Sequence, residues 1–145
     1  FLAISINTFI FKSPKFRHAM HFYIPGAIAG IIVFQVSIIA PTMFKKLKIE
    51  DFGTVIRSIW PKFFALICFL ALSSIAVMAS SGDGNNIHLG ISGFTLLASG
   101  VCYGIIPATN RATDTGNSKK FDLLHKLSVW LTVAILLANI AFLLV

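Results

Sequence analysis

The chain has 145 residues, of which 57% are hydrophobic and 12% are charged, and it contains 14 Phe but only five acidic residues. A soluble domain of this length has about twice that share of charged residues. The surplus of apolar residues must therefore face lipid, which excludes a transcription factor, a cytosolic hydrolase and a disulfide scaffold. The net charge of +7 comes from Lys and Arg in short segments between apolar blocks. In such positions basic residues orient a membrane protein, so we expect no nucleic-acid partner.

Residues 1–21 form an N-terminal segment that is first apolar and then basic. Its apolar part, residues 1–11, is too short to cross a bilayer. We expect it to be an interfacial segment or the end of a longer helix. Because the chain begins with Phe rather than Met, we also expect a processed N-terminus or missing preceding residues.

Four segments of the remaining chain are apolar and contain no Asp, Glu, Lys or Arg. Each is about as long as the ~20 helical residues that cross a hydrocarbon core, and lipid offers no partners for backbone polar groups. The sequence therefore predicts an all-α fold, in which residues 22–145 form a four-helix transmembrane bundle. The predicted spans are residues 22–40, 63–79, 87–108 and 127–145.

Two of the segments between the spans have patterns of their own. In residues 47–60 the apolar positions Phe52, Val55, Ile56 and Ile59 recur at helical spacing. This stripe predicts an interfacial amphipathic helix between spans one and two. The polar turn at residues 81–86 is short, so spans two and three are expected to form an antiparallel hairpin.

Basic residues are distributed unequally between the two sides of a four-span chain. Nine lie in the segments 41–62 and 109–126, which share one side, and three lie before the first span. The positive-inside rule predicts that both segments are cytoplasmic loops and that both termini lie outside. The nine are Lys45, Lys46, Lys48, Arg57, Lys62, Arg111, Lys119, Lys120 and Lys126, and the three are Lys12, Lys15 and Arg17.

Histidines are the candidate ligands for a metal or a cofactor. His18 and His21 share a helix face at the outer end of span one, and His88 begins span three at the same surface. Neutral imidazoles from two helices could bind copper or zinc, or two could ligate a haem. Alternatively, these histidines are amphipathic anchors that contact headgroups and water. His125 lies on the opposite side by this topology.

No ionisable residue lies at mid-depth in the four spans. Buried carboxylates and bases mark most proton and ion pathways in membranes. Their absence from the spans argues against a proton pump or an ion-coupled transporter.

Cys68 and Cys102 are expected at one depth, where they could form a disulfide or a metal pair, or simply pack as small apolar residues. Gln35, Tyr103 and Thr132 lie at a similar depth. They either form hydrogen bonds between helices or line a small polar pocket open to the cytoplasm.

Asn139 has the same two interpretations nearer the other face. Two GxxxG patterns, Gly26 with Gly30 and Gly100 with Gly104, predict faces of close helix contact. The pattern leaves open whether the contact is within the chain or with a partner.

Five runs of the sequence carry a family resemblance, namely residues 30–35, 40–44, 58–64, 106–111 and 121–128. Together they resemble a bacterial domain-of-unknown-function family related to transmembrane protein 205, over residues 18–145. This family is implied to consist of small four-helix integral membrane proteins, without an established activity. Asn110, Arg111 and His125 match its pattern around the last loop, and with Gln35 they form the candidate functional patch.

The leading hypothesis is a non-catalytic accessory or stabilising subunit of a larger complex in the bacterial inner membrane. Its expected partners are the lipid bilayer and other membrane subunits, and no cofactor is expected. One alternative is a membrane protein that binds copper, zinc or haem through His18, His21 and His88. A second alternative is a transporter of a small neutral solute, with a pocket near Gln35 and Tyr103.

Overall fold

The computed structural model describes residues 14–82 and 85–145, and within them all side chains except those of residues 14–20 and Ser81. The predicted interfacial segment 1–11 lies outside the described residues. The described chain is helical, with no strand in these two stretches. Its elements are α2 (Pro14–Phe34), the π-helix η1 (Gln35–Ile39), α3 (Ala40–Lys46), α4 (Ile49–Ser81), α5 (Asn86–Asp114) and α6 (Ser118–Phe142).

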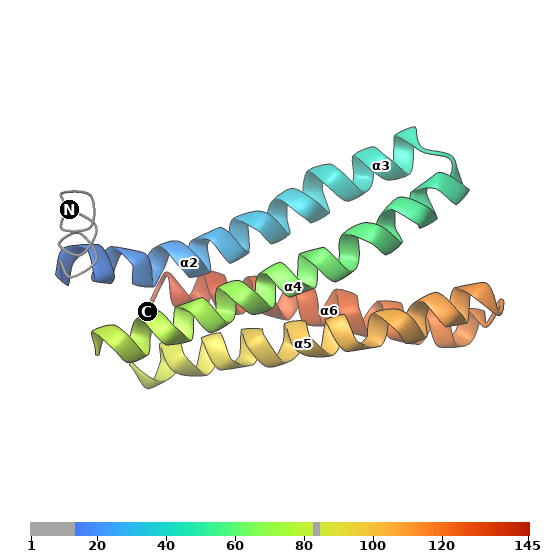
Figure 1. The fold of residues 1–145 in the computed structure, drawn as a ribbon. Helices are drawn as coiled ribbons and strands as arrows, with labels where there is room; N and C mark the ends of the chain where they lie inside the picture. Colours follow the sequence, from blue (N-terminus) through green and yellow to red (C-terminus); the bar gives the residue numbers. More distant parts are fainter. Residues whose placement is uncertain (1–13, 83–84) are drawn as a thin grey trace, which may run out of the picture.

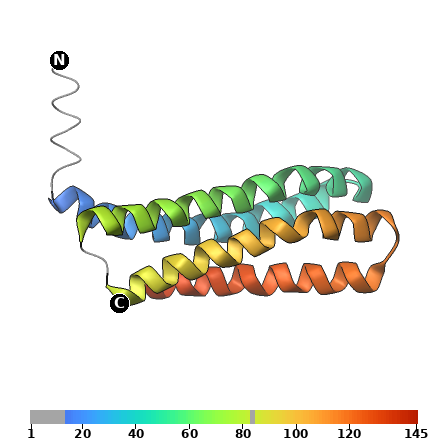
Figure 2. The ribbon, with the colours of Figure 1, turned by 60° about the horizontal axis from the view of Figure 1, so that its bottom comes forward.

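The helices lie side by side in an elongated bundle (Figures 1 and 2). The α3–α4 and α5–α6 connections lie at one end, here called the loop end. The start of α2, the end of α6 and the α4–α5 connection lie at the other end, here called the terminal end. At the loop end α3 and the start of α4 diverge from α5 and α6, so the bundle opens there (Figure 1).

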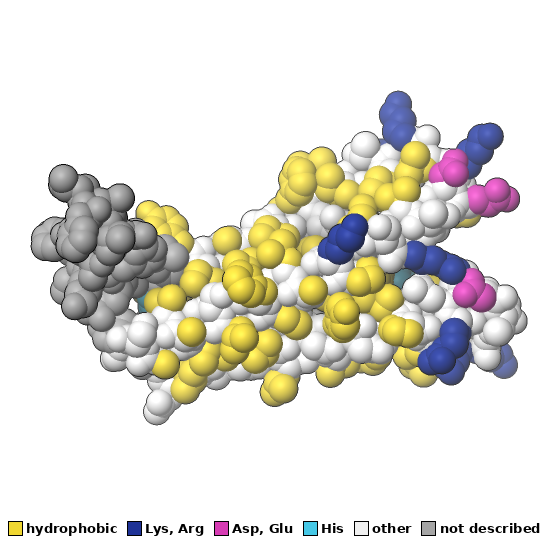
Figure 3. Space-filling view, in the orientation of Figure 1, with side chains coloured by type: hydrophobic (Ala, Val, Ile, Leu, Met, Phe, Trp, Pro, Cys, Tyr) yellow, Lys and Arg dark blue, Asp and Glu magenta, His cyan; other side chains and the backbone are white. Residues whose placement is uncertain are grey.

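The four predicted spans are confirmed as helices that are long and apolar enough to cross a membrane, so the protein is an integral membrane protein. Large apolar side chains are exposed along the length of the bundle (Figure 3). The helices are longer than the predicted charge-free spans, because a helix can continue into charged residues beyond the hydrocarbon core. The predicted loops 41–62 and 109–126 are accordingly mostly helical, and the connections are residues 47–48 and 115–117.

The predicted separate interfacial helix at residues 47–60 is not present. Those residues form the first part of α4, which continues through Pro61 to Ser81. The apolar stripe does not face the membrane surface as predicted. Two of its residues, Phe52 and Ile56, line a space between the helices of the bundle. An amphipathic stripe shows that a helix has one buried face, but it does not say whether lipid or protein covers that face.

The first span contains a π-helical turn at Gln35–Ile39. Pro41 has no N–H, so the carbonyl of Ser37 loses its usual partner, and the proline ring clashes with that carbonyl. The turn widens, and Ala40 N–H bonds to the Gln35 carbonyl instead. Such π turns occur often at functional sites.

Small polar residues, rather than the glycines of the GxxxG patterns, form hydrogen-bonded contacts between the helices. The buried face of α5 presents Ser92, Thr95, Ser99 and Cys102, and it packs between α4 and α6. Ser99 Oγ lies 3.0 Å from the Cys68 sulfur of α4, and Ser92 makes a similar hydroxyl contact with α4. These short side chains let the helices approach while bonding across the interface.

The α4–α5 hairpin is antiparallel, as predicted (Figure 2). Helix α4 ends at Gly82, whose φ of 70° is in the left-handed region that favours glycine. Asn85 then caps α5, its side chain accepting a hydrogen bond from the His88 N–H at 2.8 Å.

Candidate functional site

A cavity of about 570 Å³ lies at the loop end of the described chain and is here called the interhelical cavity. It lies between the first span, α4, α5 and α6. At this end the bundle has two arms, one formed by α3 and the start of α4, the other by α5 and α6. Figure 3 shows the hollow between them. Most of its wall is apolar, and its inner end is formed by core residues such as Ile32, Phe64 and Cys102.

The structure brings three of the four residues of the predicted functional patch to this cavity. Gln35, Asn110 and His125 come from three different helical segments, and all three line the cavity. Arg111 is exposed and does not line the cavity. The reason is helical geometry, because Arg111 follows Asn110 by one position and so points about 100° away from it.

Aromatic rings hold His125 in place at the mouth of the cavity. The imidazole is stacked between Trp60 (centroids 5.9 Å apart, 21° between planes) and Phe121 (5.5 Å, 5°). Neither Trp60 nor Phe121 was predicted as a partner of His125. The sequence signal for these two rings was their spacing from apolar neighbours on α4 and α6. That spacing does not identify the side chain that the rings contact.

An ion pair joins the two arms at the same mouth. Arg57 of α4 donates to Asp114 of α5 with an N–O distance of 2.6 Å, and both side chains are partly exposed. Arg57 also lines the cavity, whereas Asp114 does not. The segments that meet at the loop end hold nine basic and four acidic residues, so this end is electropositive.

The polar side chains in the cavity differ in whether their hydrogen bonds are used. Thr109, Ser128 and Thr132 each donate to a carbonyl of their own helix. The side-chain amides of Gln35 and Asn110 have no hydrogen-bond partner among the described residues. Two amide groups therefore remain available at a cavity that is otherwise apolar.

Two of the three histidines predicted as ligands meet at the terminal end. His21 Nε2 and His88 Nδ1 are 2.8 Å apart, with the side chains only 2% and 5% exposed. One ring donates and the other accepts, so the pair is not doubly protonated. His18 belongs to α2, but its side chain lies outside the described part of the chain. Among the described residues no group of three His, Cys, Asp or Glu could hold a metal ion.

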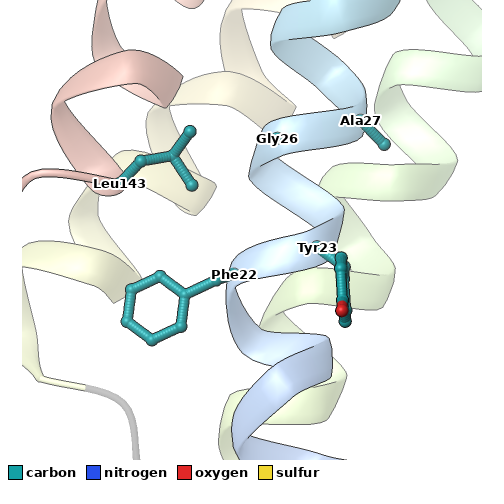
Figure 4. A pocket seen from close by; sticks show the side chains of 5 residues that line it. All are labelled: Phe22, Tyr23, Gly26, Ala27 and Leu143. Carbon is teal, nitrogen blue, oxygen red and sulfur yellow. The ribbon is translucent and has the colours of Figure 1, made fainter.

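Phenylalanine rings surround the histidine pair. Phe142 is stacked on His88, with centroids 4.1 Å apart, and lies 5.0 Å from the ring of His21. Beside the pair, a shallow surface depression separates α2 from the end of α6. Figure 4 shows Phe22 and Leu143 reaching into the space between the two helices, next to Gly26.

The glycine faces lie outside the contacts of the bundle. A Cβ added at Gly26, Gly30, Gly100 or Gly104 would meet nothing within 4 Å among the described residues. Gly30, Gly100 and Gly104 are exposed, and Gly26 is half-buried. Of the two possibilities that the sequence left open, contact within the chain is not seen, and contact with a partner stays a prediction.

The remaining polar and thiol residues are explained mainly by packing. Cys68 and Cys102 are both free, and Cys102 is fully buried. Asn139 confirms its interpretation as a bond between helices, since its Nδ2 donates to Thr95 Oγ1 at 2.9 Å. Tyr103 is 49% exposed and does not line the cavity, in contrast to the predicted pocket.

Comparison with known proteins identifies the family but no activity. Residues 24–118 match the family model described as Domain of unknown function (DUF4149). Comparisons with curated proteins and with solved structures give no match. The family match covers the first three helical spans and the mouth of the interhelical cavity on α4 and α5, and it confirms the resemblance to a family of this kind. The chain therefore belongs to the DUF4149 family of domains of unknown function.

Proposed function

We propose that the protein is a non-catalytic accessory or stabilising subunit of a larger membrane complex. The observation that supports this role is the outward position of Gly100 and Gly104 on α5. A glycine in a helix costs about 1 kcal/mol relative to alanine. Against lipid the missing side chain brings no gain, whereas a helix of another subunit can approach closely there.

The proposal is tested by filling this face. The double variant Gly100→Leu/Gly104→Leu is compared with Ala76→Leu, a substitution at an exposed position of α4. In a mild detergent, the wild type and Ala76→Leu should migrate with larger subunits, while the double variant should migrate as the 15.8 kDa chain with its detergent. A wild type that migrates as a clean monomer would contradict the proposal.

We place this subunit in the bacterial inner membrane, with the loop end in the cytoplasm. The excess of basic residues in the segments at the loop end supports this orientation. A Thr115→Cys variant places a thiol in the α5–α6 connection, which is exposed. A membrane-impermeant maleimide should label it in inverted vesicles and not in intact spheroplasts, and the reverse pattern would refute this orientation.

A second candidate function is the binding of zinc or copper, favoured by the convergence of His21 and His88. Their facing nitrogens are 2.8 Å apart, so small ring movements could place both on one ion with N–metal distances of about 2.0–2.1 Å. A haem would need its two axial ligands on opposite sides of a planar macrocycle, for which this spacing leaves no room. Elemental analysis decides the matter, because protein without stoichiometric metal after growth in zinc and copper would remove this candidate.

Transport of a small neutral solute has weaker support from the geometry. The interhelical cavity is lined mainly by apolar side chains, and Tyr103 does not reach it. Such a wall suits an apolar molecule better than a polar one.

A further inference from the structure

The interhelical cavity is long and ordered in polarity. Along α5 it extends from Thr113 to Cys102, which corresponds to about 16 Å of helix, and along α6 from Phe121 to Leu136, about 22 Å. Arg57, Asn110 and His125 line it towards the loop end, whereas Cys102 and Leu136 line it at depth.

The inner end of the cavity is closed by packed side chains. Ile32, Phe64 and Cys102 are at most 2% exposed and belong to the core cluster that joins the helices. A molecule that enters from the loop end therefore stops at this floor. The π-turn at Gln35–Ile39 is directly above it and directs Gln35 to the cavity wall.

We propose that the interhelical cavity binds one long-chain fatty acid, with its carboxylate at Arg57 and Asn110 and its acyl chain between the first span and α6. This inference does not depend on the accessory role proposed above. A long cavity with a mainly apolar wall fits an acyl chain, and the electropositive mouth fits an anionic headgroup. The amide of Asn110 supplies a donor that no described residue uses.

The volume of the cavity, about 570 Å³, is that of a site for a small molecule. A cavity of this size lies within the range of about 300–1,000 Å³ that is typical of small-molecule pockets.

The ion pair at the mouth gives the carboxylate a competitor. Asp114 accepts a hydrogen bond from Arg57 at 2.6 Å, in the role that the carboxylate of the fatty acid would take. Both side chains are partly exposed, so the pair can open without uncovering a buried charge. Loss of Asp114 should therefore strengthen binding, and loss of Arg57 should weaken it.

The chain offers a direct optical test, because it contains two tryptophans in different places. Trp60 lines the cavity, and Trp130 is 71% exposed on the outer surface of α6. The variant Trp130→Phe, in lipid nanodiscs, reports quenching of Trp60 by a dibrominated fatty acid. The matched variant Trp60→Phe reports quenching of Trp130 by the same compound dissolved in the bilayer.

Quenching of Trp60 should saturate at one fatty acid per protein, while quenching of Trp130 should rise without saturation. In the Trp130→Phe background, Arg57→Gln should raise the half-saturating concentration about tenfold, and Asp114→Asn should lower it. The methyl ester of the same fatty acid should bind to the Trp130→Phe parent more weakly than the acid does. Arg57→Gln should not change the binding of the ester.

A cavity-filling variant separates binding in the cavity from binding at the surface. Gly53 lines the cavity, whereas its neighbour Thr54 is exposed on the same helix. Gly53→Leu should abolish saturable quenching, and Thr54→Leu should leave it unchanged, with equal helix content by circular dichroism. If Gly53→Leu fails to fold, the saturation of Trp60 quenching in the Trp130→Phe parent still tests the proposal.

Four results would overturn the proposal. Trp60 quenching that rises without saturation, like that of Trp130, shows no site. Equal binding of acid and methyl ester removes the role of charge. Stronger saturable quenching by a brominated two-chain phospholipid assigns the cavity to a membrane lipid. If Trp60 is quenched only after a native complex has been dissociated, the cavity is assigned to a segment of a partner.

Discussion

The hydrogen bond between Asn139 and Thr95 provides a quantitative test of how the bundle is held together. Asn139 is 2% exposed, and its Nδ2 donates to Thr95 Oγ1 and to the carbonyl of Ile135, at 2.9 Å each. Side-chain hydrogen bonds between membrane helices contribute about 0.6 kcal/mol on average and about 1.7 kcal/mol at most. The pair should therefore change the unfolding equilibrium constant about 3- to 18-fold.

A double-mutant cycle isolates this pair from the bond to Ile135. Asn139→Leu and Thr95→Val are made singly and together, and the free energy of unfolding is measured in mixed micelles of increasing SDS content. Leu137→Ala serves as the control on α6, because Leu137 is 60% exposed. A coupling energy near zero, with both single variants folded, would refute the assignment of Asn139 as a contact between helices.

Three further predictions follow from local geometry. Gly82→Ala should destabilise the α4–α5 hairpin by about 1–2 kcal/mol in the same SDS titration, because φ is 70° at this position, and an unchanged midpoint would contradict the turn. Arg57→Ala should lower the free energy of unfolding by no more than about 1 kcal/mol, since both it and Asp114 are partly exposed, and a larger loss would show that the ion pair is structural. A water-soluble maleimide should not modify Cys102, which is fully buried, until SDS unfolds the protein, and rapid labelling of the folded protein would show that α5 and α6 separate at this depth.

The helical spans could be predicted because lipid makes a simple demand on the sequence. Every residue that faces the hydrocarbon core must be uncharged, so the four charge-free segments mark four helices. The helix ends were not predictable by the same rule. Beyond the core, segments such as 109–114 carry charge and are still helical, because nothing in them stops the helix before Gly116.

The choice of packing face could not be made from the GxxxG pattern. Glycine permits close contact, but it does not attract a helix of the same chain. The contacts of α5 are made by Ser92, Thr95 and Ser99, which add hydrogen bonds to close approach. Their spacing of three and four residues is visible in the sequence, although it competes there with the equally regular glycines.

The cavity was partly predictable from the candidate functional patch. Topology placed Asn110 and His125 near one end, and Gln35 was noted as a polar residue at depth. The contribution of α4 was missed, because the stripe containing Phe52 and Ile56 was interpreted as facing the membrane surface. Whether such a stripe faces lipid or protein depends on where the next helix lies, which a single sequence does not specify.

Crosslinking in native membranes shows directly whether the protein acts by association through α5. Leu97 is 73% exposed and shares the helix face of Gly100 and Gly104, while Trp130 is equally exposed on α6. A photoreactive residue is placed at each position in turn. We expect a discrete crosslink to another membrane protein from position 97 and crosslinks to lipid alone from position 130. Crosslinks to lipid alone from both positions would contradict association through α5.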